Sequence, residues 1–267
     1  MNDYKQVDNM IAQWKKQGLS KDQIVVNLAN ACVGWSYVWG SLGQICTTSV
    51  RKSYMNSPNI AQGDKELIKK RCPILSGTQT SCKGCKYYPN DVGSRVFDCR
   101  GFTRWVLDQV GISLQGGGAT SQWNTASNWE QKGTIDTMPK DKICCVFRYY
   151  QSSKKMEHTL LYTGDGNYIH CSGEVKKQST SSYPATHWAI PKGLYSGGST
   201  PMPEKGYAVV TARNVALRRG PSTDAGIILR VPIDKKVKLE TPPSDWEYVS
   251  YNGKEGYMMK KFLKEGV

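Results

Sequence analysis

A stretch rich in glycine, serine and proline interrupts this chain of 267 residues and limits how it can fold. Residues 193–205 read GLYSGGSTPMPEK, a composition typical of a linker rather than of a helix or a strand. The segments on either side have lengths that are normal for separate domains. We therefore predict two domains, at residues 1–192 and 206–267, joined by this linker.

The segment after the linker predicts a small all-β domain. Short apolar runs alternate there with turn residues, a pattern typical of a barrel or a sandwich. Asn252-Gly253 predicts a two-residue hairpin, because both residues accept the positive φ angles of a type I′ turn. Strands are expected at residues 209–211, 215–217, 227–231, 236–239, 246–251 and 255–258.

The first 192 residues predict an α+β fold with an antiparallel sheet. One helix is expected around residues 7–14, a second after the capping box Ser20-x-x-Gln23, and a third at residues 100–110. Because the helices come first and the strands later, we expect the helices to pack on one side of the sheet. Strands are expected at residues 143–150, 158–163, 168–171 and 187–190.

Cys99 stands where an extended segment enters the third predicted helix. The positive end of a helix dipole and its unpaired N–H groups favour a thiolate, which is the nucleophilic form of cysteine. Taken alone this signal is weak, since cysteine is often only a small buried apolar residue.

Two of the three histidines strengthen the hypothesis of a nucleophile. His158 begins one predicted strand and His170 ends the next, with residues 164–166 (GDG) between the strands. If Gly166 takes the left-handed position of a three-residue loop, His170 faces Leu160 and His158 lies on the same face of the sheet. Diagonal neighbours of this kind lie about 7–8 Å apart, so one imidazole can orient the other.

These three residues predict the chemistry of a cysteine hydrolase. Cys99 would attack a carbonyl, His158 would take its proton, and His170 would hold His158 in the productive tautomer. Two ordinary strand histidines are the alternative interpretation. His187 is interpreted as a structural or surface residue.

Three segments in order resemble motifs of the NlpC/P60 peptidoglycan hydrolases. Residues 97–102 (FDCRGF) resemble the family's Asp-Cys-Ser-Gly-Phe motif, and residues 36–40 (SYVWG) its upstream Pro-Tyr-Val-Trp-Gly-Gly segment. Residues 158–170 (HTLLYTGDGNYIH) resemble its strand–turn–strand with a histidine at both ends. Together the resemblance covers roughly residues 24–192.

The resemblance implies a papain-like fold and a cysteine peptidase that needs no cofactor. By resemblance Cys99 is the nucleophile, His158 the base and His170 the third member of the triad. Tyr37 is similar to the family tyrosine beside the nucleophile, and Asp98 to the aspartate that helps shape the substrate pocket. The implied reaction is hydrolysis of a stem-peptide amide, typically between D-glutamate and the diamino acid. Backbone amides, including that of Cys99, would stabilise the oxyanion.

Two departures from the family pattern bear on this expectation. Arg100 replaces the small serine that commonly follows the nucleophile, so a substrate carboxylate could meet it there, and the cleaved bond stays open. The second departure is an insertion at about residues 41–96 between the first two motifs.

The insertion carries four cysteines whose state the sequence leaves open. Cys82-Lys-Gly-Cys85 is a common half of a structural zinc site, but the other half, Cys46 and Cys72, has an irregular spacing. A disulfide is as plausible as zinc by sequence, and unlinked thiols are the favoured interpretation. No metal is expected in the reaction itself.

The segment after the linker resembles a bacterial SH3 domain. Residues 214–223 (NVALRRGPST) resemble that family's Leu-Asn-Val-Arg-x-Gly-Pro-Ser segment, and residues 246–257 resemble its closing hairpin. The resemblance implies an SH3-like barrel that binds cell-wall peptide. A passive spacer is the alternative interpretation.

The formal net charge of +14 predicts a polyanionic partner. Residues 1–204 carry +9 and residues 205–267 carry +5, and no long basic run predicts nucleic-acid binding. Together these features predict a monomeric endopeptidase of bacterial peptidoglycan that acts at the cell wall and inserts into no membrane. With no recognisable signal peptide, it would be made in the cytoplasm and released by lysis, like a phage endolysin, or be a trimmed secreted protein. An amidase or acyltransferase on the same scaffold and a non-catalytic wall-binding protein are the alternatives.

Overall fold

The computed structural model describes residues 1–16, 19–195, 206–239 and 245–265, and the chain divides into two compact units. The first unit comprises Met1–Ser196 and the second Gly197–Val267. Of the predicted linker, residues 196–205 lie outside the described residues. Residues 193–195, the first part of the predicted linker, pack on the first unit. Leu194 is buried in the core of this unit, and the Tyr195 hydroxyl accepts a hydrogen bond from the Ile143 N–H.

The first unit begins with two amphipathic helices, α1 (Tyr4–Lys16) and α2 (Lys21–Ala31). The predicted capping signal is present at α2, where the Gln23 side chain accepts a hydrogen bond from the Ser20 N–H at 3.0 Å. α1 packs against α2, and α2 packs against α6 (Cys99–Asp108), which carries the nucleophile motif.

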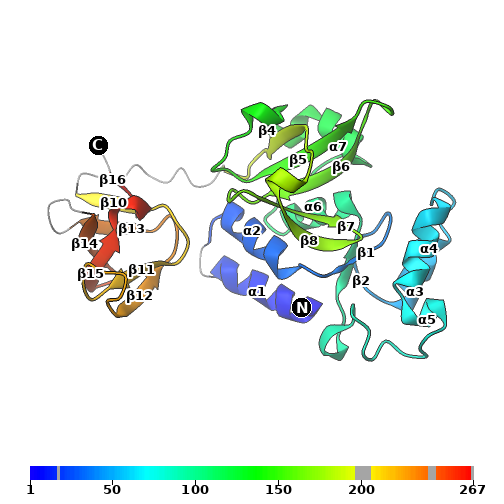
Figure 1. The fold of residues 1–267 in the computed structure, drawn as a ribbon, viewed down its shortest axis with the longest axis horizontal. Coiled ribbons are helices and arrows are strands. Elements are labelled where there is room, and N and C mark those ends of the chain that lie inside the picture. Colours follow the sequence, from blue (N-terminus) through cyan, green and yellow to red (C-terminus); the bar gives the residue numbers. More distant parts are fainter. Residues whose placement is uncertain (17–18, 196–205, 240–244, 266–267) are drawn as a thin grey trace. The chain divides into compact units, whose positions relative to one another are not determined.

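A nine-stranded sheet forms the centre of this unit, in the order β2-β3-β1-β8-β7-β6-β5-β9-β4 (Figure 1). Sequence reasoning found the strands from β5 to β7 and β9 but did not place β1, β2, β3, β4 or β8. The strands are β1 (Ser36–Tyr37), β2 (Leu42–Ile45), β3 (Arg95–Phe97), β4 (Trp129–Thr134), β5 (Cys144–Tyr150), β6 (Lys155–Tyr162), β7 (Asn167–Ser172), β8 (Glu174–Ser179) and β9 (His187–Pro191).

The sheet departs from the predicted antiparallel pattern at one pair of strands. β1 and β3 run parallel, with Tyr37 opposite Phe97, while every other described pair in this sheet is antiparallel. Parallel neighbours need a long crossover, and the insertion supplies it. It contains α3 (Thr48–Met55), α4 (Gln62–Lys70) and α5 (Pro73–Ser76), which lie together beyond the β1–β2 side of the sheet (Figure 1).

Two apolar clusters lie on the two faces of this sheet. Alternate residues of β5 and β6 divide between them, as Phe147 and Leu161 join the helices in one cluster while Val146 and Leu160 join the other. The helices α1, α2, α6 and α7 (Ala119–Asn124) contribute only to the first cluster. The main helices therefore cover one face, which places the start of α6 against the sheet.

The β6–β7 hairpin has the predicted three-residue loop. Leu161 pairs with Ile169, the Thr163 N–H donates to the Asn167 carbonyl, and Gly166 has a φ of +80°. This register places His170 opposite Leu160. The turn residues therefore determine which face of the sheet carries both histidines.

The second unit is a seven-stranded antiparallel sheet in the order β12-β11-β15-β14-β13-β10-β16. Asn252 and Gly253 both have positive φ and join Tyr251 to Lys254, as the hairpin signal predicted. The unit comprises β10 (Tyr207–Val210), β11 (Val215–Arg218), β12 (Ile227–Val231), β13 (Lys236–Leu239), β14 (Trp246–Tyr251), β15 (Lys254–Met259) and β16 (Leu263–Glu265).

The predicted SH3-like barrel is not confirmed in the second unit. Among its described residues the outer strands β12 and β16 do not pair, so the sheet does not close. Its core is nevertheless that of a separate domain, built around Leu217, Val237 and Val249, each fully buried.

Short 3-10 helices complete the chain. They are η1 (Pro89–Asp91), η2 (Ala126–Asn128), η3 (Ile135–Thr137), η4 (Thr180–Ser182) and η5 (Lys260–Phe262). None of the helices in the described ranges is long and apolar enough to cross a membrane.

Candidate active site

The first turn of α6 positions the candidate nucleophile. Asp98 is the N-cap of this helix, and its Oδ1 accepts a hydrogen bond from the Gly101 N–H at 2.5 Å, which places Cys99 at the first helical position. Gly101 has no room for a side chain, since a Cβ there would come within 2.0 Å of the Ser41 carbonyl oxygen. This glycine lets the helix start press against the segment after β1.

The Cys99 thiol lies between α6 and β6. Its sulfur accepts hydrogen bonds from the backbone N–H groups of Thr159 and Arg100. Burial raises the pKa of the Cys99 thiol to about 12, and the neighbouring Asp98 carboxylate acts in the same direction. The Arg100 N–H at the helix start does act to lower the pKa of this thiol, as the sequence predicted, but burial outweighs it.

A chain of hydrogen bonds runs from His158 across β7 to β8. His158 Nε2 lies 2.8 Å from His170 Nδ1, and His170 Nε2 lies 3.1 Å from Gln178 Oε1. The Gln178 amide is oriented by its Nε2, which donates to the Ser182 carbonyl at 3.0 Å. The two histidines predicted to interact therefore do so directly, and Gln178 extends the chain.

This chain determines the tautomers of both neutral rings. Because Gln178 presents an oxygen, His170 Nε2 must carry the proton that it donates, which leaves His170 Nδ1 as an acceptor. His158 Nε2 then donates to His170, and His158 Nδ1 keeps a free lone pair. The ring nitrogen that can accept a proton is therefore Nδ1 of His158.

Both imidazoles are held in the neutral form. Burial lowers the pKa of His158 to about 3, with the neighbouring His170 adding to the effect. Burial likewise lowers the pKa of His170 to about 4, while the hydrogen bond to Gln178 opposes that shift. The Cys99 thiol and both imidazoles are therefore neutral over the ordinary pH range.

The residues predicted to contact substrate surround the start of α6. Asp98 Oδ2 accepts a hydrogen bond from the Gly40 N–H at 3.1 Å and lies 4.0 Å from Arg100 Nη2. Burial raises the pKa of Asp98, although these contacts oppose the shift. Tyr37 on β1 lies near enough to Cys99 to interact with it electrostatically, and burial raises the pKa of its phenol.

Sequence reasoning missed Tyr54, Gln178 and Tyr183 in this region. Tyr54 comes from the insertion, packs 3.5 Å from where a Cβ of Gly40 would be, and interacts with Asp98. The Tyr183 ring lies 5.7 Å from His158 and 5.4 Å from His170. None of the three belongs to a recognisable motif, so only the fold brings them to the site.

The remaining predicted residues lie outside this arrangement. The His187 ring packs at 5.0 Å against Trp123, as expected of a structural histidine. All nine cysteines are free thiols, and the four of the insertion line a separate small cavity, described below.

Comparison with known proteins identifies the domain that carries this site. Residues 84–191 match the NlpC/P60 family, a span that includes Cys99, His158 and His170. A segment of 77 residues is 32% identical to the probable endopeptidase p60 of Listeria grayi, covering 29% of this chain and 13% of that protein. The similarity to the family is thus confined to a part of the chain, residues 84–191, and the chain spans only a small part of the length of the curated relative.

Solved structures of the same family show weaker similarity. NlpC1 from Trichomonas vaginalis aligns with a TM-score of 0.37 and 17% identity, over 64% of this chain and 45% of that one. RipD from Mycobacterium tuberculosis, described as a non-catalytic NlpC/p60 domain protein adapted to peptidoglycan binding, aligns with a TM-score of 0.37 and 14% identity, over 64% and 96%. The family match does not extend to residues 206–267.

Proposed function

We propose that this protein is a cysteine endopeptidase that hydrolyses an amide bond in the stem peptides of bacterial peptidoglycan. Cys99 is the nucleophile, His158 the general base and His170 the residue that orients it. The observation that carries the proposal is the hydrogen-bonded pair His158–His170, together with the Thr159 backbone N–H that links its strand to the Cys99 thiol, within the span that matches the NlpC/P60 family.

The proposed reaction begins from the neutral pair. His158 Nδ1 takes the thiol proton as Cys99 Sγ bonds to the substrate carbonyl carbon, and backbone N–H groups at the helix start stabilise the oxyanion. The C–N bond then breaks, and His158 returns the proton to the leaving amine. Water hydrolyses the resulting thioester by the same proton transfers in reverse order.

Arg100 supports a substrate with a carboxylate beside the cleaved bond. Its guanidinium lies 4.0 Å from Asp98, too far for a strong hydrogen bond, so its planar N–H donors can still meet a second carboxylate. Asp98 itself is engaged by the N–H groups of Gly40 and Gly101. A free D-glutamate carboxylate fits this role, and we propose the bond between D-glutamate and the diamino acid as the cleaved bond.

This specificity is tested with matched soluble stem peptides that carry either D-glutamate or D-isoglutamine. The wild-type protein should prefer the free acid by about tenfold or more in kcat/KM, the size of one charged hydrogen bond. Arg100→Gln should abolish the preference and leave slow cleavage of both peptides. If Arg100→Gln preferred the D-glutamate peptide as strongly as the wild-type protein does, the proposed contact between Arg100 and the substrate carboxylate would be excluded.

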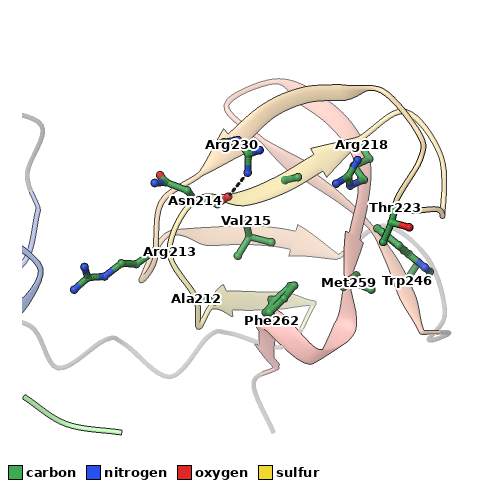
Figure 2. A pocket seen from close by; sticks show the side chains of 11 residues that line it. Ala212, Arg213, Asn214, Val215, Arg218, Thr223, Arg230, Trp246, Met259 and Phe262 are labelled. Atoms are coloured by element: carbon green, nitrogen blue, oxygen red, sulfur yellow. Dashed lines mark hydrogen bonds between the residues drawn. The ribbon is translucent and has the colours of Figure 1, made fainter. Parts of the chain in front are cut away.

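The second unit is proposed to bind the wall. It holds a pocket that combines apolar side chains with arginines, and Figure 2 shows Arg213, Arg218 and Arg230 around it together with Trp246 and Phe262. Guanidinium groups bind carboxylates well, and aromatic side chains add contact area. The pocket therefore supports a peptide ligand that carries a carboxylate, as stem peptides do.

Wall binding is tested with the full chain carrying Cys99→Ala, sedimented with purified walls. Replacing Arg213 and Arg230 by glutamine should weaken binding more than replacing the exposed Arg219 and Lys254, which removes the same charge outside the pocket. If both double variants lost wall binding equally, general electrostatic attraction between the basic protein and the wall would explain the binding. That attraction weakens as the salt concentration rises.

The reaction itself is tested by mass spectrometry of digested peptidoglycan. Wild-type protein should release fragments with a new amino terminus on the diamino acid, and Cys99→Ala should release none while still binding walls. Cys144→Ala, which removes a buried thiol that belongs to the second apolar cluster, should remain active. A new amino terminus on L-alanine would instead identify an amidase, and wild-type protein that binds without cleaving would identify a wall-binding protein. Turbidity loss of intact cells would support an endolysin role.

A further inference from the structure

Four cysteines that are scattered in the sequence line one cavity in the insertion. Cys46 follows β2, Cys72 is the N-cap of α5, and Cys82 and Cys85 belong to the segment after that helix. Cys72 and Cys85 each lie near enough to Cys46 and to Cys82 to interact electrostatically with both. The cavity is small, with a volume of about 10 Å³, which is enough for one small bound species.

Two of these cysteines sit on a tight turn. The Cys85 N–H donates to the Cys82 carbonyl at 3.0 Å, and Gly84 takes a φ of +74° inside the turn. The two-residue spacing is the one found in structural zinc sites. The turn therefore supplies one preformed pair of sulfur ligands.

A buried cation beside the thiols has no acidic partner. The Arg51 side chain lines the cavity and is 2% exposed, and its Nη1 makes no hydrogen bond. Within the described part of the chain, no carboxylate forms an ion pair with it. Its Nε donates instead to Cys46 Sγ at 3.3 Å, and its Nη2 to Ser36 Oγ at 2.7 Å.

The charge balance distinguishes the possible states of the four sulfurs. A buried guanidinium without a counter-charge costs several kcal/mol. Two disulfides or four neutral thiols leave Arg51 uncompensated, whereas four thiolates around a divalent ion carry a net charge of −2. Arg51 and Arg71, which also lines the cavity, would balance that charge.

Hydrogen-bond donors to the sulfurs are also in place. Arg51 donates to Cys46, and the Thr48 side chain makes a hydrogen bond with Cys82. Outer contacts of this kind orient metal ligands and stabilise thiolates. Residues 77–88 contain no helix or strand, so a metal crosslink would supply order that regular structure does not.

We propose that Cys46, Cys72, Cys82 and Cys85 bind one zinc ion in a closed, tetrahedral thiolate site that holds the insertion together. In the ion-free arrangement no three His, Cys, Asp or Glu side chains of the described residues already form a group that could hold a metal. Binding must therefore draw the sulfurs inward, through rotation of the cysteine side chains, and release their four protons to solvent. The site is structural, so the proposal does not depend on the peptidase reaction.

The first test is the metal content of the full-length protein after reconstitution with zinc under reducing conditions and removal of free metal. Wild-type protein should retain about one zinc per chain, and Cys144→Ala, whose thiol lies in another cluster, should retain the same. The double variant Cys82→Ala/Cys85→Ala should retain almost none. Wild-type protein without zinc, or a double variant with as much zinc as wild type, would overturn the proposal.

A second test uses wild-type protein alone, so it does not depend on the variant folding. Zinc-loaded protein and protein stripped with a strong chelator are alkylated, and the labelled peptides are measured by mass spectrometry. The four cysteines should be protected by zinc and labelled about tenfold faster after stripping, while labelling of Cys99 should change little. Equal labelling of the four, or disulfides among them that persist in the zinc-treated, reduced protein, would overturn the site.

Discussion

The two buried histidines make the stability of the first unit depend on pH in a specific window. The pKa of His170 falls from 6.5 to about 4 on folding and that of His158 to about 3, in both cases through burial. Between these values and 6.5 the unfolded chain binds protons that the folded protein does not. The free energy of unfolding of the first unit is therefore highest above pH 6.5 and decreases as the pH falls towards 4.

The size of this effect follows from the pKa difference. For His170, which is 1% exposed, a lowering of about 2.5 pKa units corresponds to about 3 kcal/mol lost by pH 4. About 2 kcal/mol of that is already lost at pH 5 by the same relation. His158 shifts in the same direction, but the two rings share a hydrogen bond, so their contributions do not simply add.

The assay is denaturant unfolding at pH 7.5 and pH 5, followed by tryptophan fluorescence. Trp246 is the only tryptophan after the linker, so the signal reports mainly the first unit. Wild-type protein should lose at least about 2 kcal/mol more on acidification than the variant His158→Gln/His170→Gln, since glutamine does not titrate. His187 and the carboxylates are common to both proteins and cancel. An equal loss in both proteins would refute the interpretation that the folded protein holds these rings neutral.

Three further predictions concern the site. The acid limb of kcat/KM should have an apparent pKa near 4 rather than 6.5, measured with a soluble stem peptide, because the His158–His170 pair stays neutral until His170 is protonated. Gln178→Ala should lower kcat by about tenfold and alter that acid limb, while Gln178→Glu, which can still accept from His170, should restore activity. Gly101→Ala should destabilise the first unit by about 1–3 kcal/mol in thermal unfolding and reduce activity, because its Cβ meets the Ser41 carbonyl. Gly117→Ala, with open space around its Cβ, is the matched control and should change neither.

Local sequence signals predicted the elements that local interactions determine. The capping box before α2, the Asn252-Gly253 turn and the three-residue loop before Asn167 all follow from residues close in the chain. The loop had the largest consequence, because its register placed His158 and His170 on one face. Side chains alternate along a strand, so a turn of known length determines the facing pairs.

The sequence did not predict the elements that depend on distant partners. Strand β8 has few apolar residues, so no periodicity predicts it, and Gln178 reaches His170 only because β8 pairs with β7. β1 and β3 are very short and are stabilised by each other across the insertion. Their pairing depends on contacts between segments that are far apart in the chain.

The sequence by itself identified the residues proposed for the chemistry: a cysteine at a helix start and two histidines at the ends of a hairpin. Only the tertiary structure decided their protonation, because burial comes from the packing of the whole unit. Burial opposes the thiolate that the helix end favours, and it keeps both imidazoles neutral. The tertiary structure also gathered the four cysteines of the insertion around Arg51, a grouping that their spacing did not predict, because the chain between them folds back through α3, α4 and α5.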